Sequence, residues 1–198
     1  ENYGGVFNEK TIDSFIRKYN TSTKFLSKAK ENFARSCAGY CIATYVLGIS
    51  DRHPSNYMVC KNGQFFHIDF GHFLGNWKHK WGIKRERTPL VFTNQMRFAI
   101  ANETDALYKH FLVWCCSAYN ILRDNNRLLL ILFRLMIAAG MEELVSESDI
   151  LYFQDTLKLS MDEKAATKHI EKAIDVALKD WGTYVNNKLH QIRHQNKK

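Results

Sequence analysis

The chain has 198 residues, of which 45% are apolar and 24% are charged, so its composition excludes a disordered tail and favours one globular domain or one lobe of a larger domain. Its formal net charge of +8 favours an anionic partner such as a lipid headgroup, a nucleotide or a nucleic acid. The longest apolar run, Leu128 to Ala139, is interrupted by Arg134 and is shorter than the roughly 20 residues that span a bilayer, so we expect any membrane contact to be peripheral.

The five cysteines are odd in number and follow no zinc-binding spacing. Cys115 and Cys116 are adjacent and cannot easily pair with each other. These features favour a reducing, intracellular setting. The first residues also lack the basic patch and the apolar run of a signal peptide, so we expect a cytoplasmic protein.

Two helices are predicted before residue 50. Residues 11–19 place Ile12, Phe15 and Ile16 on one face, and residues 20–23 form a polar break. Residues 29–47 combine apolar residues at steps of three and four with many small residues, which predicts a buried central helix. Gly48 is expected to end this helix.

The stretch from Ser50 to Gly71 reads S-D-R-H-P-S-N-Y-M-V-C-K-N-G-Q-F-F-H-I-D-F-G. It predicts a loop, a strand, a turn, a second strand and a second loop, because Pro54 excludes helix just before it and Asn62-Gly63 is a strong hairpin signal. The hairpin therefore brings two polar loops together at one end. One loop offers Asp51, His53 and Asn56, and the other offers Asp69 before a glycine.

These residue types suit phosphoryl transfer. Asn56 and Asp69 can supply amide and carboxylate oxygens to a metal that bridges phosphates. Asp51 or His53 can accept the proton of an acceptor hydroxyl. The alternative is a plain surface hairpin whose Asp and Asn side chains cap turns. That alternative explains any one of these residues well, but it explains the whole string at this spacing poorly.

The segment after Gly71 is strongly basic and ends at Pro89. A charge run is usually a solvated face, and that interpretation stays open here. The position directly after Asp-Phe-Gly favours instead a surface that holds a polyanionic acceptor. The cations concerned are Lys78, Lys80, Lys84, Arg85 and Arg87.

Helical patterns dominate the rest of the chain. A capping box that begins at Ser160 predicts a helix to about residue 179. The tail from residue 181 is either a basic amphipathic segment or a frayed C-terminus. Residues 94–100 fit a strand or a short helix, and helices are predicted at 103–123, 127–139 and 148–157.

The Ser50–Gly71 string, with the R-S-C-A-G-Y-C helix before it, resembles the catalytic and metal-binding loops of the phosphoinositide 3-kinase and related-kinase superfamily. The triplet Asp-Arg-His has the order typical of the phosphoinositide kinase branch. The resemblance covers nearly the whole chain, with two departures: Ser50 replaces the usual Gly, and Asn187 stands where the last helix often has an apolar or aromatic residue. It implies a mainly α fold with a small β-hairpin, the C-terminal lobe of a kinase catalytic domain over residues 1–198. Its parts would be a catalytic loop at 48–56, an activation loop at 69–89 and a helical part at 103–198.

The resemblance also implies the reaction: transfer of the γ-phosphoryl group of ATP to the inositol 3-hydroxyl of a phosphoinositide. Asp69 and Asn56 would hold Mg²⁺. His53 would accept the hydroxyl proton, because its ordinary pKa lies near neutrality, and Asp51 would orient it. His72 would assist with the transferred phosphate.

Two residues of the hairpin are candidates for binding ATP. Met58 and Ile68 would form an apolar floor under adenine, and ordinary core packing explains both residues as well. His67 is expected to be a core histidine with satisfied hydrogen bonds.

The basic segment is similar to the activation loop of class I phosphoinositide 3-kinases, whose two basic boxes recognise the 4- and 5-phosphates of the inositol ring. This implies phosphatidylinositol 4,5-bisphosphate at a membrane surface as the substrate, and not nucleic acid. Two alternatives remain. Pro54-Ser55 favours a serine/threonine protein kinase of the related branch, and a non-catalytic phosphoinositide-binding module could also keep the basic segment.

No Gly-rich strand-turn-strand and no strand lysine of an upper kinase lobe precede residue 50. We therefore expect the N-terminal lobe and other domains of a longer parent to complete the enzyme, with a regulatory subunit as a further candidate partner. We also expect the 198 residues alone to have no useful activity.

Overall fold

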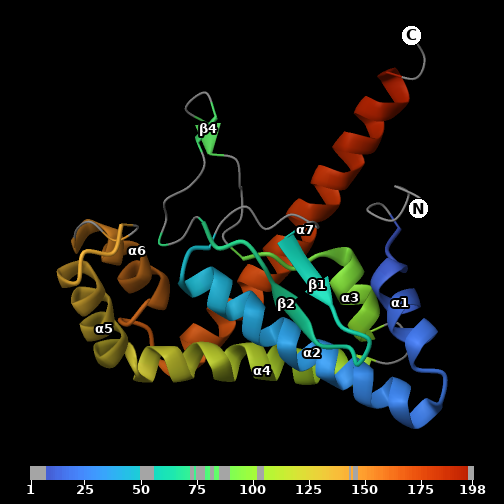
Figure 1. Ribbon diagram of the computed structural model, residues 1–198, viewed down its shortest axis with the longest axis horizontal. Helices are drawn as coiled ribbons and strands as arrows, with labels where there is room; N and C mark the ends of the chain where they lie inside the picture. The colour runs from blue at the N-terminus through green and yellow to red at the C-terminus, as the bar shows by residue number, and fades with distance from the viewer. Residues whose placement is uncertain are drawn as a thin grey trace.

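The computed structural model describes residues 8–49, 56–71, 74, 79–80, 83–84, 90–101, 105–142, 144 and 147–195. Residues 79, 80, 83, 84 and 181–195 are described by their backbone alone. The described part is mainly helical with a small antiparallel hairpin, as expected (Figure 1). Its elements are α1 (Thr11–Tyr19), α2 (Thr23–Val46), β1 (Tyr57–Val59), β2 (Phe65–His67), β3 (His79–Lys80), β4 (Ile83–Lys84), α3 (Asn94–Ala101), α4 (Asp105–Asp124), α5 (Asn126–Ala138), α6 (Glu147–Leu157) and α7 (Glu163–Gln195).

Helix α2 is the central element, as its many small residues predicted. It packs against α4 and against β2, with Phe33, Cys37 and Ile42 among its buried residues (Figure 1). The expected start at residue 29 is wrong, because the helix begins at Thr23. The Ser22 side chain accepts a hydrogen bond from the Phe25 N–H at 3.3 Å, so the polar break is the N-terminal cap of this helix.

The hairpin β1–β2 has the turn that the sequence predicted. Met58 lies opposite Phe66, and Gly63 in the turn has a φ of 88°. Successive side chains of a strand point to opposite faces. Phe65 and His67 are buried against α2, and Met58 is exposed on the outer face.

The C-terminal half differs from the prediction mainly in α7. This helix runs to Gln195, so both its expected end near residue 179 and a backbone frayed from residue 181 are wrong. Its cap is Asp162, whose Oδ1 accepts a hydrogen bond from the Ala165 N–H at 2.7 Å, and not Ser160. Residues 94–101 form a helix, which decides between the two predicted alternatives. In the described residues, no helix is both long and apolar enough to cross a bilayer.

Candidate functional site

The structure describes only part of the predicted site. Asp51, His53, His72, Lys78, Arg85 and Arg87 lie outside the described residues. Lys80 and Lys84 are described by their backbone in β3 and β4. Asn56, Met58, Ile68 and Asp69 are described in full, and the geometry below rests on them.

The C-terminal end of α2 is where the chain enters the predicted catalytic loop. Gly48 has a φ of 57° and ends the helix as predicted. The Ile49 N–H returns to the Thr44 carbonyl at 2.9 Å, so the turn is fixed by the helix itself. This turn sets the position from which residue 50 continues.

A contact with α7 holds the same end of α2. Tyr45 Oη and Nε2 of His169 lie 2.9 Å apart, and the Tyr152 hydroxyl donates to the Tyr45 carbonyl at 3.0 Å. Burial raises the pKa of Tyr45, with smaller contributions from Tyr119 and Tyr152. Burial also lowers the pKa of His169, with Lys158 and Lys172 adding to the effect. Both groups are therefore neutral near pH 7, and α6 and α7 brace the turn by neutral hydrogen bonds.

The hairpin brings Asn56 next to the strand end that carries Asp69. The Asn56 carbonyl accepts a hydrogen bond from the Ile68 N–H at 3.0 Å, and it lies 3.2 Å from Nδ1 of His67. Asn56 and His67 are buried, which agrees with a core role for His67. Asp69 follows Ile68 directly, so the two predicted metal-binding residues lie at the same end of the hairpin, as the sequence predicted.

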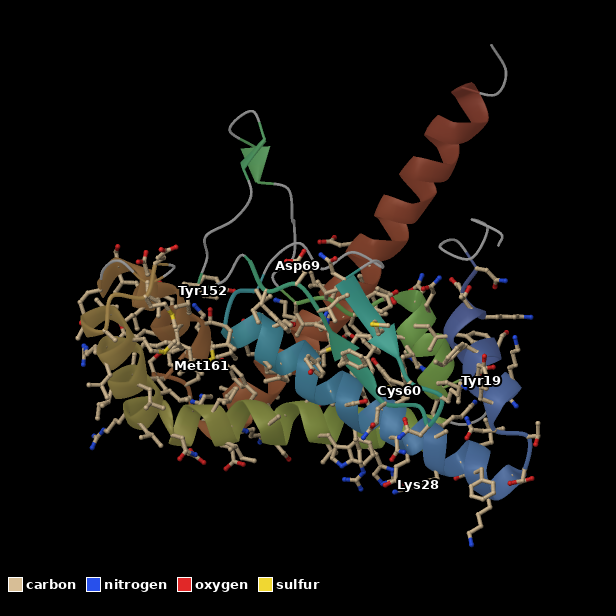
Figure 2. The ribbon with its side chains drawn as sticks, in the orientation of Figure 1. Tyr19, Lys28, Cys60, Asp69, Tyr152 and Met161 are labelled. Atoms are coloured by element: carbon tan, nitrogen blue, oxygen red, sulfur yellow. The ribbon has the colours of Figure 1, made fainter. Side chains whose placement is uncertain are left out.

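Asp69 has an unusual backbone conformation. Its φ is 61°, which is uncommon for a residue with a side chain. Its Oδ1 accepts a hydrogen bond from the Gly71 N–H at 3.4 Å. The residue is exposed on the side of the molecule from which the β3–β4 hairpin projects (Figure 2). Backbone strain of this kind is concentrated at functional sites.

The outer face of the β1–β2 hairpin is apolar and open to solvent. Met58 is 51% exposed, Ile68 is 37% exposed, and Phe70 just beyond them is 48% exposed. Phe66 and Ile68 lie on the face of the hairpin opposite to the buried His67, because successive strand residues alternate between faces. Met58 is the cross-strand partner of Phe66, so Met58 and Ile68 share this outer face. In the described residues, core packing therefore does not account for these two side chains.

Within the basic segment, the described strands β3 and β4 pair in antiparallel fashion. Lys80 pairs with Ile83, and His79 pairs with Lys84, so the backbones of Lys80 and Lys84 lie on neighbouring strands. The sequence predicted two basic clusters but not the antiparallel pairing of the strands that contain Lys80 and Lys84. By the resemblance Lys80 would belong to the first basic box and Lys84 to the second, so this register brings one residue of each box onto the same short hairpin.

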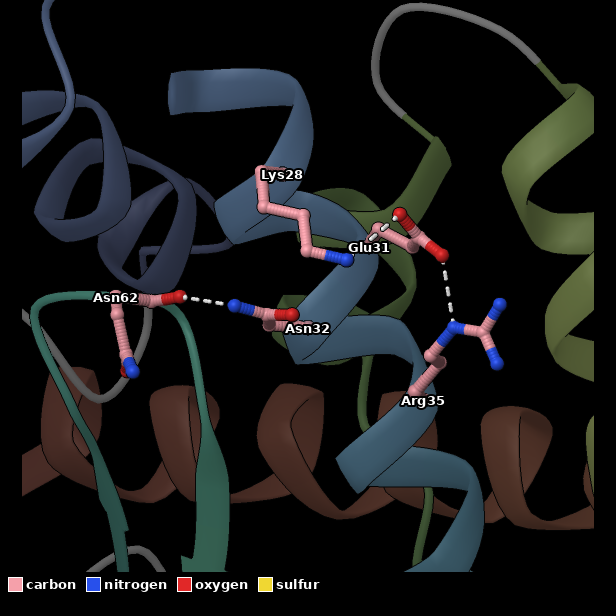
Figure 3. Close-up of polar contacts among 5 residues, drawn as sticks. All are labelled: Lys28, Glu31, Asn32, Arg35 and Asn62. Carbon is pink, nitrogen blue, oxygen red and sulfur yellow. Dashed lines mark hydrogen bonds and ion pairs between the residues drawn. The ribbon is translucent and has the colours of Figure 1, made fainter. Parts of the chain in front are cut away.

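Three polar side chains that the sequence did not single out fasten the β1–β2 turn. Asn20 Nδ2 donates to the Lys61 carbonyl at 2.7 Å, and Asn32 Nδ2 donates to the Asn62 carbonyl at 3.0 Å (Figure 3). The Phe65 N–H donates to the Ser36 hydroxyl at 2.9 Å. The only sequence signals were Asn32 and Ser36 inside a helical pattern, where they are poor helix formers, and Asn20 in the polar break.

The oxygen-rich pair Asn56 and Asp69 fits a hard divalent cation such as Mg²⁺, which prefers carboxylate and amide oxygens. In the described residues, no group of three or more His, Cys, Asp or Glu side chains gathers as a metal site. A cation bound here would therefore take further oxygen ligands from water or from phosphate groups, as Mg²⁺ commonly does.

Comparisons with known proteins agree with these features. A family model described as "Phosphatidylinositol 3- and 4-kinase" matches residues 4–146. Phosphatidylinositol 3-kinase 2 of Dictyostelium discoideum is 43% identical over 191 residues, which are 96% of this chain and 10% of that protein. The rat phosphatidylinositol 3-kinase C2 domain-containing subunit gamma is 38% identical over 190 residues, which are 95% of this chain and 13% of that protein. The chain thus spans about a tenth of the length of these curated relatives.

Proposed function

Because the chain belongs to the phosphatidylinositol 3- and 4-kinase family, we propose that it is the C-terminal lobe of a lipid kinase. The parent protein would transfer the γ-phosphoryl group of ATP to the inositol 3-hydroxyl of a phosphoinositide. The names of the relatives, phosphatidylinositol 3-kinases, support the 3-hydroxyl as the acceptor. The observation that carries the proposal is the meeting of Asn56 with the Ile68–Asp69 strand end.

In this proposal each residue of the site has one role. Asp69 and Asn56 hold Mg²⁺, which neutralises negative charge that develops on the phosphates. His53 accepts the proton of the acceptor hydroxyl, with Asp51 orienting it and His72 close to the transferred group. The exposed faces of Met58 and Ile68 support the adenine ring, and their open position is the reason for this assignment.

The basic segment is the proposed headgroup site. Phosphatidylinositol 4,5-bisphosphate is the proposed substrate, because two clusters of cations suit two ring phosphates. Lys80 and Lys84, one from each cluster, lie on the neighbouring strands β3 and β4. The cations are Lys78, Lys80, Lys84, Arg85 and Arg87.

An assay of the full-length parent tests this function. Purified parent, ATP and Mg²⁺ are mixed with vesicles that carry phosphatidylinositol, its 4-phosphate or its 4,5-bisphosphate, and separately with a protein-kinase peptide. We expect phosphate transfer to lipid and none to the peptide. Transfer to the peptide alone would establish the protein-kinase alternative, and binding without transfer would establish the non-catalytic alternative.

A triple variant tests the substrate assignment. Replacing Lys84, Arg85 and Arg87 with Ala should lower turnover of the bisphosphate more than turnover of the unphosphorylated lipid. A matched control replaces Lys164, Lys168 and Lys172, which are exposed on α7, and removes the same charge elsewhere. If the two triple variants behave alike, the loss reflects net charge and the headgroup assignment is wrong.

The isolated chain is a separate test. We propose that the 198 residues need an upper lobe and other domains of the parent, and that the full enzyme works at a membrane surface. Robust ATP turnover by the purified chain alone would contradict this part of the proposal.

A further inference from the structure

Leu74 combines a strained backbone with deep burial. Its φ is 50°, a left-handed conformation that leucine rarely adopts, and its side chain is only 3% exposed within the core. Its N–H donates to the Leu47 carbonyl at 2.7 Å. A strained conformation of this kind persists only where the surroundings impose it.

The Leu74 hydrogen bond completes a pair. The Ile68 N–H donates to the Asn56 carbonyl at 3.0 Å, and the Leu74 N–H donates to the Leu47 carbonyl at 2.7 Å. The two donor N–H groups lie at the two ends of segment 68–74, which contains Asp69. The acceptors are the two ends of segment 47–56, which ends in Asn56. The segment with the carboxylate is therefore tied at both ends to the segment with the amide.

We propose that Leu74 is a positioning residue that holds the Asp69 carboxylate at the distance from Asn56 that a divalent cation requires. This inference rests on the proposed function, in which those two residues hold Mg²⁺. One tie alone, at Ile68, would let the chain after it swing about the end of β2. The second tie limits this motion, and the burial of the Leu74 side chain keeps the tie closed.

The test uses the full-length parent with Leu74→Ala and measures lipid phosphorylation against Mg²⁺ concentration at saturating ATP. Mutation of residues that orient metal ligands typically lowers metal affinity by about 10- to 100-fold. We therefore expect the Mg²⁺ requirement, the Mg²⁺ concentration that gives half-maximal turnover, to rise about tenfold. We expect turnover to recover largely at high Mg²⁺. Leu157→Ala is the matched control, because Leu157 is equally buried in α6, and its Mg²⁺ requirement should stay that of the wild type.

Two further variants keep the test decisive. Leu74→Met retains an apolar side chain of similar volume without a branch at Cβ, so it should keep the wild-type Mg²⁺ requirement. Leu74→Val retains apolar volume, but its β-branch resists the left-handed backbone, so its Mg²⁺ requirement should rise as in Leu74→Ala. If Leu74→Ala does not fold, Leu74→Val decides. A wild-type Mg²⁺ requirement in the folded Ala or Val variant would overturn the proposal.

Hydrogen–deuterium exchange separates this inference from the proposed function. The Leu74 amide and peptides that cover 68–74 should exchange faster in Leu74→Ala than in the wild type or in Leu157→Ala, whether or not the parent phosphorylates lipid. Unchanged protection there would overturn the tie itself. A wild-type parent without lipid kinase activity would instead overturn the proposed function.

Discussion

Gly63, in the turn of the β1–β2 hairpin, lies against the main chain of Ala29 in α2: a Cβ added to it would be 1.9 Å from the Ala29 carbonyl oxygen. Gly63 also has a φ of 88°. Gly63→Ala therefore has to separate the turn from α2 and strain the backbone. We expect the free energy of unfolding to fall by about 2 kcal/mol or more, measured by urea titration of the purified chain.

The control for this change is Gly39→Ala in the same helix. A Cβ on Gly39 would meet no atom within 4 Å. The residue is exposed to solvent and lies in the middle of α2, away from the helix ends. Alanine is the better helix former, so this variant should gain up to about 1 kcal/mol. Equal effects of the two variants would show that the close approach of the turn to α2 is not real.

A buried ion pair joins α1 to α2. Lys30 Nζ lies 2.9 Å from Asp13 Oδ1, with the two side chains 5% and 7% exposed, and Arg17 Nε lies 2.8 Å from Asp13 Oδ2. In Lys30→Met the Asp13 carboxylate stays buried and loses Lys30, while its ion pair with Arg17 remains. We expect a loss of about 3 kcal/mol in the free energy of unfolding, because removal of one partner leaves buried charge poorly compensated.

A second change tests that reason. The double variant Lys30→Met with Asp13→Leu removes both charges and should recover most of the lost stability in the same urea titration. Lys28→Met serves as the exposed control, because Lys28 pairs with Glu31 at 3.4 Å with its own side chain 65% exposed (Figure 3). Its effect should stay within about 0.5 kcal/mol. A double variant as unstable as Lys30→Met would exclude the stranded carboxylate as the cause.

Local signals were enough to predict much of this fold and the placement of Asn56 and Asp69 at one end of the hairpin. The Asn62-Gly63 turn fixed the hairpin register, and that register alone placed Asn56 beside the Ile68–Asp69 strand end. Gly48 ended α2 where expected. Each of these features depends on residues that are close in the sequence, so the pattern contains the necessary information.

Contacts between distant residues were not predictable in the same way. The Asn32 side chain bonds the Asn62 carbonyl, and the Leu74 N–H bonds the Leu47 carbonyl, and neither contact leaves a pattern in the sequence around it. The start of α2 was missed because a serine before a helix fits both a break and a cap. The length of α7 was missed although Val185, Leu189 and Ile192 recur at helical spacing, because Gly182 and the Asn186-Asn187 pair are poor helix formers.

The cysteines should differ sharply in reactivity. Cys37, Cys41, Cys115 and Cys116 are buried, whereas Cys60 after β1 is partly exposed. Burial raises the pKa of Cys37 and of Cys115, and burial with the nearby Glu171 raises the pKa of Cys116 to about 11. The thiolate is the reactive form, so iodoacetamide at pH 8 should modify Cys60 first, as read by peptide mass spectrometry.

Unfolding provides the control for this prediction. In urea all the cysteines should react at similar rates, because the burial that protects the other thiols is lost. The Cys60→Ser variant should show little modification while it is folded. Rapid labelling of Cys115 in the folded chain would contradict the packing of α4 against α2.

Asp69 is the residue on which the proposed chemistry depends most directly. Asp69→Asn keeps the size of the side chain and removes the charge that would bind Mg²⁺. We expect kcat of the full-length parent on lipid to fall by roughly 100-fold or more, because a bound metal contributes several kcal/mol of charge stabilisation in the transition state. Thermal unfolding should change little, because the residue is exposed.

Asp105→Asn is the matched control for Asp69→Asn. Asp105 begins α4, its side chain is 73% exposed, and it pairs with Arg97 at 3.3 Å. The same charge is lost there, far along the chain from the hairpin, so kcat should stay within about twofold of the wild type, as expected for a weak surface pair. If instead the two variants retain equal activity, Asp69 does not bind the metal, and the strained backbone at its position needs another explanation.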